Sequence, residues 1–212
     1  MDATTPLGAE LYGERGSTGV VVVHEVFGRD DYIRSVARAL ADAGYPAAAV
    51  DLYDGKYAAS LDEAFALRGS LTEAAILARL DDARVGLEKV AGAARVGTLG
   101  FCMGGGYALL GACRRPFAFA VDYYGRIDRA EDVATVRGPV LLLLASEDER
   151  ITPWAFAQLL PAARQAQRRV SVELYPGVRH AFHRPGWEGH DAAAAASAWA
   201  RTLAFLRDLP PP

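Results

Sequence analysis

Cysteine is scarce in this chain of 212 residues, and two cysteines are too few for a disulfide framework. The four histidines are scattered, so we expect no metal site and no metal or organic cofactor. An excess of basic residues is also absent, because 23 lysines and arginines stand against 26 aspartates and glutamates. This balance argues against nucleic acid or a membrane surface as a partner and favours a small molecule.

Long apolar runs are missing as well, since no stretch approaches the roughly 18 residues that a membrane span requires. The first residues lack the basic start and apolar core of a signal peptide, so we expect a cytoplasmic protein in a reducing environment. No break in composition divides the chain, and we expect residues 1–212 to form a single domain. For its assembly we expect a monomer or a weak homodimer.

Short apolar runs alternate with longer segments of helical periodicity, which predicts an α/β fold with an open, mostly parallel sheet and helices on both faces. Strands are expected at 19–25, 45–53, 95–101, 117–125, 139–147 and 169–177. Helices are expected at 29–44, 70–91, 104–114, 153–167 and 190–208, with Ser70 and Glu73 as a capping box and Pro153 in a first turn. The connections 52–69 and 177–190 are expected to be irregular.

The segment GTLGFCMGGGYALL, residues 97–110, places a cysteine between glycines where a predicted strand becomes a predicted helix. Its core, Gly100-Phe101-Cys102-Met103-Gly104, has the spacing of the nucleophile elbow G-x-S-x-G, with cysteine in place of serine. The glycines are needed because the strained turn leaves no room for side chains beside the nucleophile. Such a turn points the N–H of Met103 at a developing oxyanion, and the positive end of the following helix favours the thiolate.

Two more reactive side chains follow predicted strands. Asp148 comes after PVLLLLASE, and His180 comes after VELYPGVR. Ligands of open α/β sheets bind beyond the carboxyl ends of the strands, and the chain order nucleophile, acid, histidine is the order of the triad in α/β-hydrolases. We therefore predict a catalytic triad of Cys102, Asp148 and His180.

Each of these residues also has a purely structural interpretation. A small cysteine beside glycines is compatible with helix–strand packing. Asp148 is compatible with a helix cap or a turn, and His180 with a hydrogen-bonded histidine that has no chemical role. The order and the common position of the three at strand ends favour the catalytic interpretation.

The remaining histidines and the second cysteine receive less weight. His183 and His190 are rival bases, but they lie further into the loop than His180. His24 ends a strand that we expect to be buried, so we interpret it as structural. Cys113 lies within a predicted helix and is interpreted as a packing residue.

Six motifs span residues 20–184: HEVFG (24–28), DLY (51–53), GFCMGG (100–105), YYG (123–125), ED before Thr-Pro (147–153) and YPGVRHAFHR (175–184). In these motifs the chain resembles the dienelactone hydrolase family of α/β-hydrolases. The resemblance implies an α/β-hydrolase-type fold and hydrolysis of a lactone or carboxylic ester, such as a dienelactone (carboxymethylenebutenolide), through a thiolate and a thioester acyl-enzyme.

The resemblance also implies roles for three residues. Glu25 matches the family glutamate that contacts the nucleophile and takes up its proton, and a poorly hydrated carboxylate there would have a raised pKa. Val26 matches the position whose backbone N–H is the second oxyanion donor. Arg184 matches an arginine that holds a substrate carboxylate, which implies an anionic substrate. The alternatives are a buried Glu25 paired with an arginine, and a solvated Arg184 on the surface.

The sequence departs from the family at one position. The second carboxylate-binding arginine of the family falls near Leu61, so it is missing here, and Arg68 is a candidate substitute. Tyr124 and Phe65 are candidates for the pocket lining, although aromatic residues at strand ends are as often core residues. Because of this departure, the resemblance does not determine the substrate, although the expected reaction is unchanged.

Three alternatives to a lactone hydrolase remain at this point. One is a general carboxylesterase of the same fold. Another is a redox-sensing thiol at Cys102, for which Cys113 would be the resolving cysteine. The third is a non-catalytic protein that binds a small acid, since a fold by itself does not establish chemistry.

Overall fold

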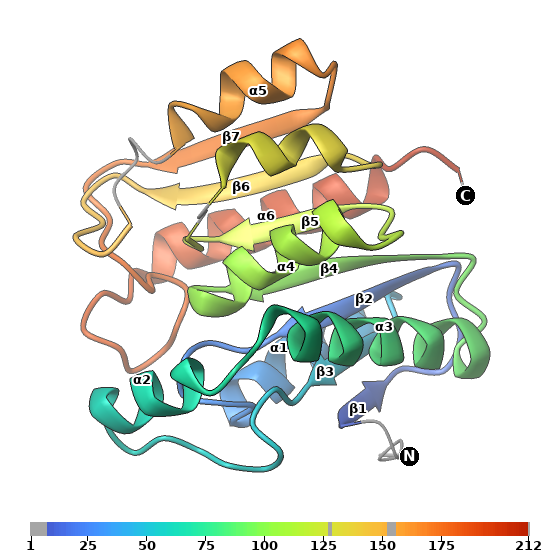
Figure 1. The fold of residues 1–212 in the computed structure, drawn as a ribbon, viewed down its shortest axis with the longest axis horizontal. Helices are drawn as coiled ribbons and strands as arrows, with labels where there is room; N and C mark the ends of the chain where they lie inside the picture. Colours follow the sequence, from blue (N-terminus) through green and yellow to red (C-terminus); the bar gives the residue numbers. More distant parts are fainter. Residues whose placement is uncertain (1–7, 127–128, 152–155, 212) are drawn as a thin grey trace.

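The computed structural model describes residues 8–126, 129–151 and 156–211. Its centre is one seven-stranded sheet in the order β1-β3-β2-β4-β5-β6-β7 (Figure 1). The strands are β1 (Ala9–Tyr12), β2 (Thr18–Val23), β3 (Ala47–Val50), β4 (Arg95–Phe101), β5 (Ala120–Tyr123), β6 (Val140–Ala145) and β7 (Val170–Tyr175). All neighbouring strands are parallel except β1, which pairs antiparallel with β3 at the edge.

Helices cover both faces of this sheet. They are α1 (Asp31–Asp42), α2 (Leu61–Gly69), α3 (Glu73–Val90), α4 (Met103–Arg114), α5 (Leu159–Gln165) and α6 (Ala192–Arg207), with the short 3-10 helix η1 (Ala130–Thr135). In Figure 1, α3, α4 and α5 lie in front of the sheet, and α1 and α6 lie behind it. Among the described residues, no helix combines the length and the apolar character needed to cross a bilayer.

The alternation of side chains along the strands builds a separate core on each face. Val21 and Val23 of β2 belong to the core beneath α3 and α4, whereas Val20 and Val22 belong to the core beneath α1 and α6. Because successive strand residues point to opposite faces, a strand covered on both sides must be apolar throughout. This explains the continuous apolar runs of β2 and β6.

The mostly parallel α/β fold and all six predicted strands are confirmed, as β2 to β7 with ends shifted by a few residues. The predicted helices at 29–44, 104–114 and 190–208 are confirmed as α1, α4 and α6. Strand β1 was not predicted. The expectation that the connection 52–69 is irregular is wrong for its second half, which forms α2. Of the expected helix 153–167, the structure shows α5 over its second half, and Pro153 lies outside the described residues.

The predicted start of the second helix is wrong. Ser70 belongs to the end of α2, where its hydroxyl donates to the Leu67 carbonyl. Thr72 is the N-cap of α3 instead, since its side chain accepts the N–H of Ala75. Thr72 is next to Glu73, so the separation of three residues that a capping box requires does not exist.

Candidate active site

Cys102 sits on a tight turn between β4 and α4. Its backbone has φ 51° and ψ −118°, a conformation that residues with side chains rarely adopt. A Cβ added to Gly100 would overlap the carbonyl of Gly104, and one added to Gly104 would overlap the carbonyl of Val23. The two glycines therefore allow β4, the turn and α4 to approach closely, as the elbow motif predicts.

The structure brings the three predicted triad residues together. Sγ of Cys102 lies 3.1 Å from Nε2 of His180, and Nδ1 of His180 lies 2.7 Å from Oδ2 of Asp148. The other oxygen of Asp148 accepts the backbone N–H groups of Arg150 and Ile151 at 2.9 and 2.8 Å. Asp148 is therefore both a turn residue and the partner of the imidazole, so its two interpretations are compatible.

The His180 imidazole is largely buried, with 8% of the residue exposed. Burial alone lowers its pKa, but the hydrogen bonds to Asp148 and Cys102 outweigh burial and raise the pKa to about 9. The ring of Tyr124 packs edge-on against the imidazole, with ring centroids 5.2 Å apart. The protonated imidazole has a hydrogen-bond acceptor on each side, the carboxylate of Asp148 and the sulfur of Cys102.

The other three histidines form hydrogen bonds with groups other than Cys102 and Asp148. Nδ1 of His183 lies 2.8 Å from the hydroxyl of Tyr32, and burial together with the neighbouring His190 lowers the pKa of His183 to about 4. His190 contacts the Phe182 carbonyl at 2.9 Å. His24 is fully buried, and its Nε2 accepts the N–H of Leu52 at 3.1 Å. The structural interpretation of His24 is therefore confirmed.

The two predicted oxyanion donors are both close to Cys102, since Val26 lines the same pocket and Met103 is the next residue in the chain. Met103 is the first residue of α4, and the first N–H groups of a helix have no intrahelical acceptor. In the described part of the chain, no backbone carbonyl accepts the N–H of Val26 either. Tyr53 contacts both residues: its hydroxyl lies 3.1 Å from the Val26 carbonyl oxygen and 3.3 Å from the Met103 sulfur.

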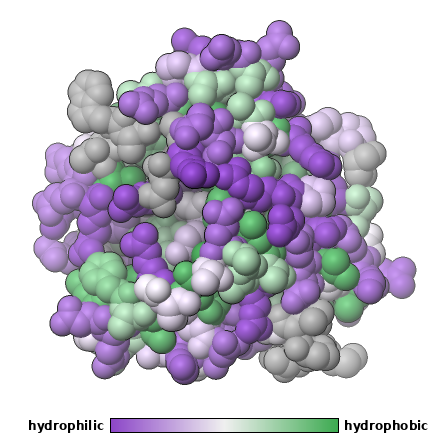
Figure 2. All heavy atoms as spheres, viewed as in Figure 1, coloured by the Kyte–Doolittle hydropathy of each residue, from purple (hydrophilic) through white to green (hydrophobic). Residues whose placement is uncertain are grey.

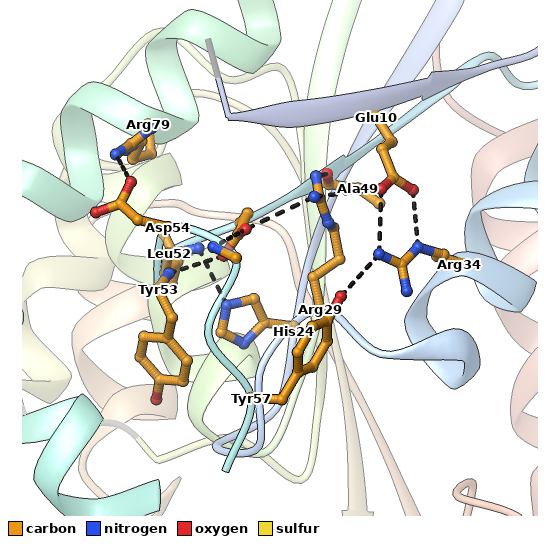
Figure 3. A network of polar contacts seen from close by, with 12 residues as sticks. Glu10, His24, Arg29, Arg34, Ala49, Leu52, Tyr53, Asp54, Tyr57 and Arg79 are labelled. Atoms are coloured by element: carbon orange, nitrogen blue, oxygen red, sulfur yellow. Dashed lines mark hydrogen bonds and ion pairs between the residues drawn. The ribbon is translucent and has the colours of Figure 1, made fainter. Parts of the chain in front are cut away.

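A polar network fixes the segment after β3 that carries Tyr53 (Figure 3). The N–H of Tyr53 donates to Asp51 at 2.8 Å. Further out, Arg34 contacts both Glu10 and the hydroxyl of Tyr57, the latter at 2.8 Å. These contacts connect the segment after β3 to β1 and α1, and they stabilise the position of Tyr53.

Glu25 is buried and paired with Arg184. Nη1 of Arg184 lies 2.6 Å from Oε2 of Glu25, and Nη2 lies 2.5 Å from Asp30. The other carboxylate oxygen of Glu25 is buried and has no hydrogen-bond partner among the described residues. Burial raises the pKa of Glu25, while Arg184 opposes that rise. The alternative interpretation of Glu25, a buried carboxylate paired with an arginine, describes the observed contacts.

A small pocket of about 310 Å³ opens over Cys102, and we call it the Cys102 pocket. Its wall contains Glu25, Val26, Phe27, Leu61, Cys102, Arg150, His180, Ala181, Arg184 and Trp187. Leu61 thus stands on the wall where the family resemblance places an arginine. Sequence reasoning missed Arg150 and Trp187, although Arg150 is two residues from Asp148, and the rule of strand ends applies to it as well.

The other predicted substrate residues lie away from this wall. Arg68 and Phe65 are both on α2, where Phe65 is 49% exposed and Arg68 lines a different pocket. Tyr124 is fully buried and contacts the His180 imidazole, and it is not part of the pocket wall. Five of the ten predicted site residues therefore line this pocket: Glu25, Val26, Cys102, His180 and Arg184. Asp148 joins them through its contact with His180, and Met103 follows Cys102 directly in the chain.

Known proteins share this fold. The solved dienelactone hydrolase of Anabaena variabilis superposes with a TM-score of 0.69 and 27% identity, and the alignment covers 95% of this chain and 92% of that one. A dienelactone hydrolase-like promiscuous phosphotriesterase from metagenomic libraries superposes with a TM-score of 0.81 and 26% identity, over 95% and 92% of the two chains.

Sequence comparison agrees with the structural likeness. A Bradyrhizobium protein named "Probable 2-oxo-3-(5-oxofuran-2-ylidene)propanoate lactonase" is 31% identical over 204 residues, which cover 89% of this chain and 82% of that protein. The model of the dienelactone hydrolase family matches residues 7–209. This match spans nearly the whole sequence, and the chain belongs to the dienelactone hydrolase family.

Proposed function

We propose that this ester-bond hydrolase cleaves a lactone or carboxylic ester through an acyl-enzyme on Cys102, with His180 and Asp148 completing the triad. The observation that supports the proposal most directly is the continuous chain of contacts from Sγ of Cys102 through His180 to Asp148 at 3.1 and 2.7 Å. This chain ends at Cys102, which lines a pocket together with Glu25, Val26 and Arg184.

The reaction proceeds in two halves. The Cys102 thiolate forms a bond to the carbonyl carbon, and the backbone N–H groups of Val26 and Met103 bind the oxyanion. When the carbon–oxygen bond of the ester breaks, the protonated His180 gives its proton to the leaving alkoxide. His180 then takes a proton from water, the hydroxide displaces the sulfur from the thioester, and the thiolate returns. Asp148 orients the imidazole throughout.

The substrate class that we propose is an anionic lactone or ester similar to a dienelactone. Arg184 supports an anionic substrate, because its guanidinium lies on the pocket wall and suits a carboxylate. A substrate carboxylate must, however, compete there with Glu25 and Asp30. Replacing Arg184 by Ala should raise KM for an anionic lactone far more than for a neutral ester, and an equal effect on both would exclude a carboxylate contact.

The test of the nucleophile compares the two cysteines of α4 and its turn. Cys102→Ala should lower kcat/KM for p-nitrophenyl acetate and for an unsaturated lactone by at least about a thousandfold. Cys113→Ala is the matched control and should keep the wild-type rate. Equal rates for Cys102→Ala and wild type would remove the proposed nucleophile.

The redox alternative gains no support from Cys113. Burial and the nearby Asp132 raise the pKa of the Cys113 thiol to about 11, so it stays protonated near neutral pH. A resolving cysteine must attack as a thiolate. Iodoacetamide should therefore abolish ester hydrolysis by reacting at Cys102, in wild type and in Cys113→Ala alike.

A further inference from the structure

A carboxyl group is buried behind the turn that carries Cys102. It belongs to Asp122, the third residue of β5, and none of its surface is exposed. Figure 2 shows the face of the molecule that carries α3 and α4, on which hydrophilic residues surround smaller hydrophobic patches. Asp122 is not one of those surface residues, because its side chain lies against Gly105 in the first turn of α4. Aspartate is seldom buried so completely without a charged partner.

Two glycines make room for this carboxyl. A Cβ added to Gly105 would overlap Oδ1 of Asp122, and so would a Cβ added to Gly125. The Cβ on Gly125 would also overlap the backbone nitrogen of Gly106. The turn after β5 therefore packs directly on the backbone of α4, with Asp122 between the two segments.

The Asp122 carboxyl also closes the turn that contains Tyr124. Its Oδ1 accepts the N–H of Gly125 at 2.7 Å. Within this turn Tyr124 has φ 42°, in the left-handed region that residues with side chains rarely adopt. The ring of Tyr124 packs edge-on against the imidazole of His180. Asp122 thus supports one of the contacts that hold the proposed base.

The nucleophile is connected to the same two segments. The N–H of Gly105 donates to the carbonyl of Cys102 at 3.0 Å. The N–H of Cys102 in turn donates to the carbonyl of Tyr123 at 3.0 Å. The backbone of Cys102 is therefore held by α4 on one side and by the turn after β5 on the other, and Asp122 lies where these two meet.

The surroundings of Asp122 supply no counter-ion. The residues against it or opposite it in the sheet have no titratable group: Gly105 of α4, Gly125 of its own turn, Gly100 of β4 and Leu142 of β6. Within the described part of the chain, its Oδ2 is buried and has no hydrogen-bond partner. Burial raises the pKa of Asp122 to about 7, against the opposing effect of the Gly125 N–H. The carboxyl is therefore protonated below pH 7 and ionises above it.

We propose that Asp122 is a positioning residue that works as a neutral acid, holding the turn after β5 against α4 and thereby fixing Cys102 and His180. This proposal rests on the function proposed above. The neutral form is required because a carboxylate at Gly105 would face the positive end of α4, which also favours the Cys102 thiolate. Ionised Asp122 should therefore disfavour the thiolate and slow acylation as the pH rises through 7.

The test uses Asp122→Asn, which keeps an acceptor for the Gly125 N–H but cannot ionise. We compare kcat/KM for p-nitrophenyl acetate as the ratio of wild type to Asp122→Asn. This ratio should lie within about twofold of one at pH 5.5 and fall by about tenfold at pH 8.5, which corresponds to a shift of about one unit in the thiol pKa. A carboxyl with a merely structural role would leave the ratio independent of pH.

Alkylation by iodoacetamide measures the thiol itself. In a Cys113→Ala background, where Cys102 is the remaining thiol, the ratio of alkylation rates with Asp122 and with Asn at that position should fall in the same way. Asp208→Asn is the matched control, because it removes an exposed carboxyl at the end of α6. The ratio of wild type to this control should not change with pH.

A second variant tests the contact with Gly125. Asp122→Ala removes the acceptor of its N–H and should lower kcat about tenfold at each pH while KM changes less than about twofold. Wild-type kcat in Asp122→Ala would overturn the positioning role. If this variant does not fold, the pH dependence of Asp122→Asn decides alone.

The failures of the two proposals can be told apart. A ratio of wild type to Asp122→Asn that stays constant from pH 5.5 to 8.5 would overturn the neutral acid. So would a loss of more than about tenfold in Asp122→Asn at pH 5.5, because the ionised form would then be the active one. Wild-type hydrolysis by Cys102→Ala would overturn the proposed nucleophile instead.

Discussion

Sγ of Cys102 and Nε2 of His180 lie 3.1 Å apart, although 78 residues separate them in the chain. The contact exists because β4 and β7 are parallel strands of one sheet, and the segments after them leave it at the same edge. Asp148 after β6 joins them there for the same reason. The imidazole is held on three sides, by sulfur, by carboxylate and by the ring of Tyr124.

The first prediction distinguishes the two histidines of the loop after β7. His180→Ala should lower kcat/KM for p-nitrophenyl acetate by at least about a thousandfold, because the proton acceptor of the thiol is lost. His183→Phe should keep the activity within a few-fold of wild type, since the His183 ring packs among Tyr32, Phe101 and Tyr123. Comparable losses in both variants would contradict the assignment of the base.

The second prediction concerns pH and stability. The imidazole of His180 has a pKa near 6.5 when unfolded and about 9 in the fold, so folding favours its protonated form. The stabilisation is complete below pH 6.5, declines between pH 6.5 and 9, and is lost above pH 9. It amounts to about 3 kcal/mol. Urea unfolding should show that wild type exceeds His180→Gln in stability at pH 6 more than at pH 9.5; an excess independent of pH would contradict this.

The third prediction concerns the pair of Glu25 and Arg184. Arg184→Ala leaves a carboxylate that is only 4% exposed without its cation, and should lower the free energy of unfolding at pH 8 by about 3 kcal/mol. Burial raises the pKa of Glu25, so the loss should shrink as the pH falls and the carboxyl becomes protonated. Urea unfolding at pH 8 and pH 5 measures both effects.

Two controls accompany that experiment. Arg184→Ala/Glu25→Gln should recover most of the lost stability, because it removes the uncompensated charge. Arg179→Ala removes an exposed arginine from the same loop and should change stability little, since its ion pairs with Glu149 and Glu188 are on the surface. If the double variant were less stable than Arg184→Ala, the buried charge would not be the cause.

The sheet was predictable because its parallel strands are apolar throughout, but β1 and α2 were not. Strand β1 has four residues at the sheet edge, too few for a periodic pattern. In α2, Ala64 is the buried residue, so the helix presents no apolar stripe. The sequence nevertheless contains a signal for the start of α2, a serine followed three residues later by a glutamate. Ser60 is the N-cap and its hydroxyl accepts the N–H of Glu63, while the Glu63 side chain accepts the N–H of Ala59.

Some residues of the site were likewise predictable from the sequence, and others were not. The residue types and their positions after strands predicted Cys102, Asp148 and His180, since strand ends converge at one edge. The partners of Arg184 were not predictable, because the distance between Glu25 and Asp30 depends on how the segment between β2 and α1 folds. Arg150 and Trp187 come to the pocket from irregular segments, whose path no periodicity specifies.

The measurement that tests the central claim most directly is detection of the acyl-enzyme. Wild-type protein is mixed with p-nitrophenyl acetate, quenched in acid within the first turnover and examined as intact protein and as peptides by mass spectrometry. The account predicts a burst of p-nitrophenol and one acetyl group on Cys102, with neither in Cys102→Ala. Steady hydrolysis with an unmodified Cys102, or an acetyl group that persists in Cys102→Ala at the wild-type rate, would contradict it.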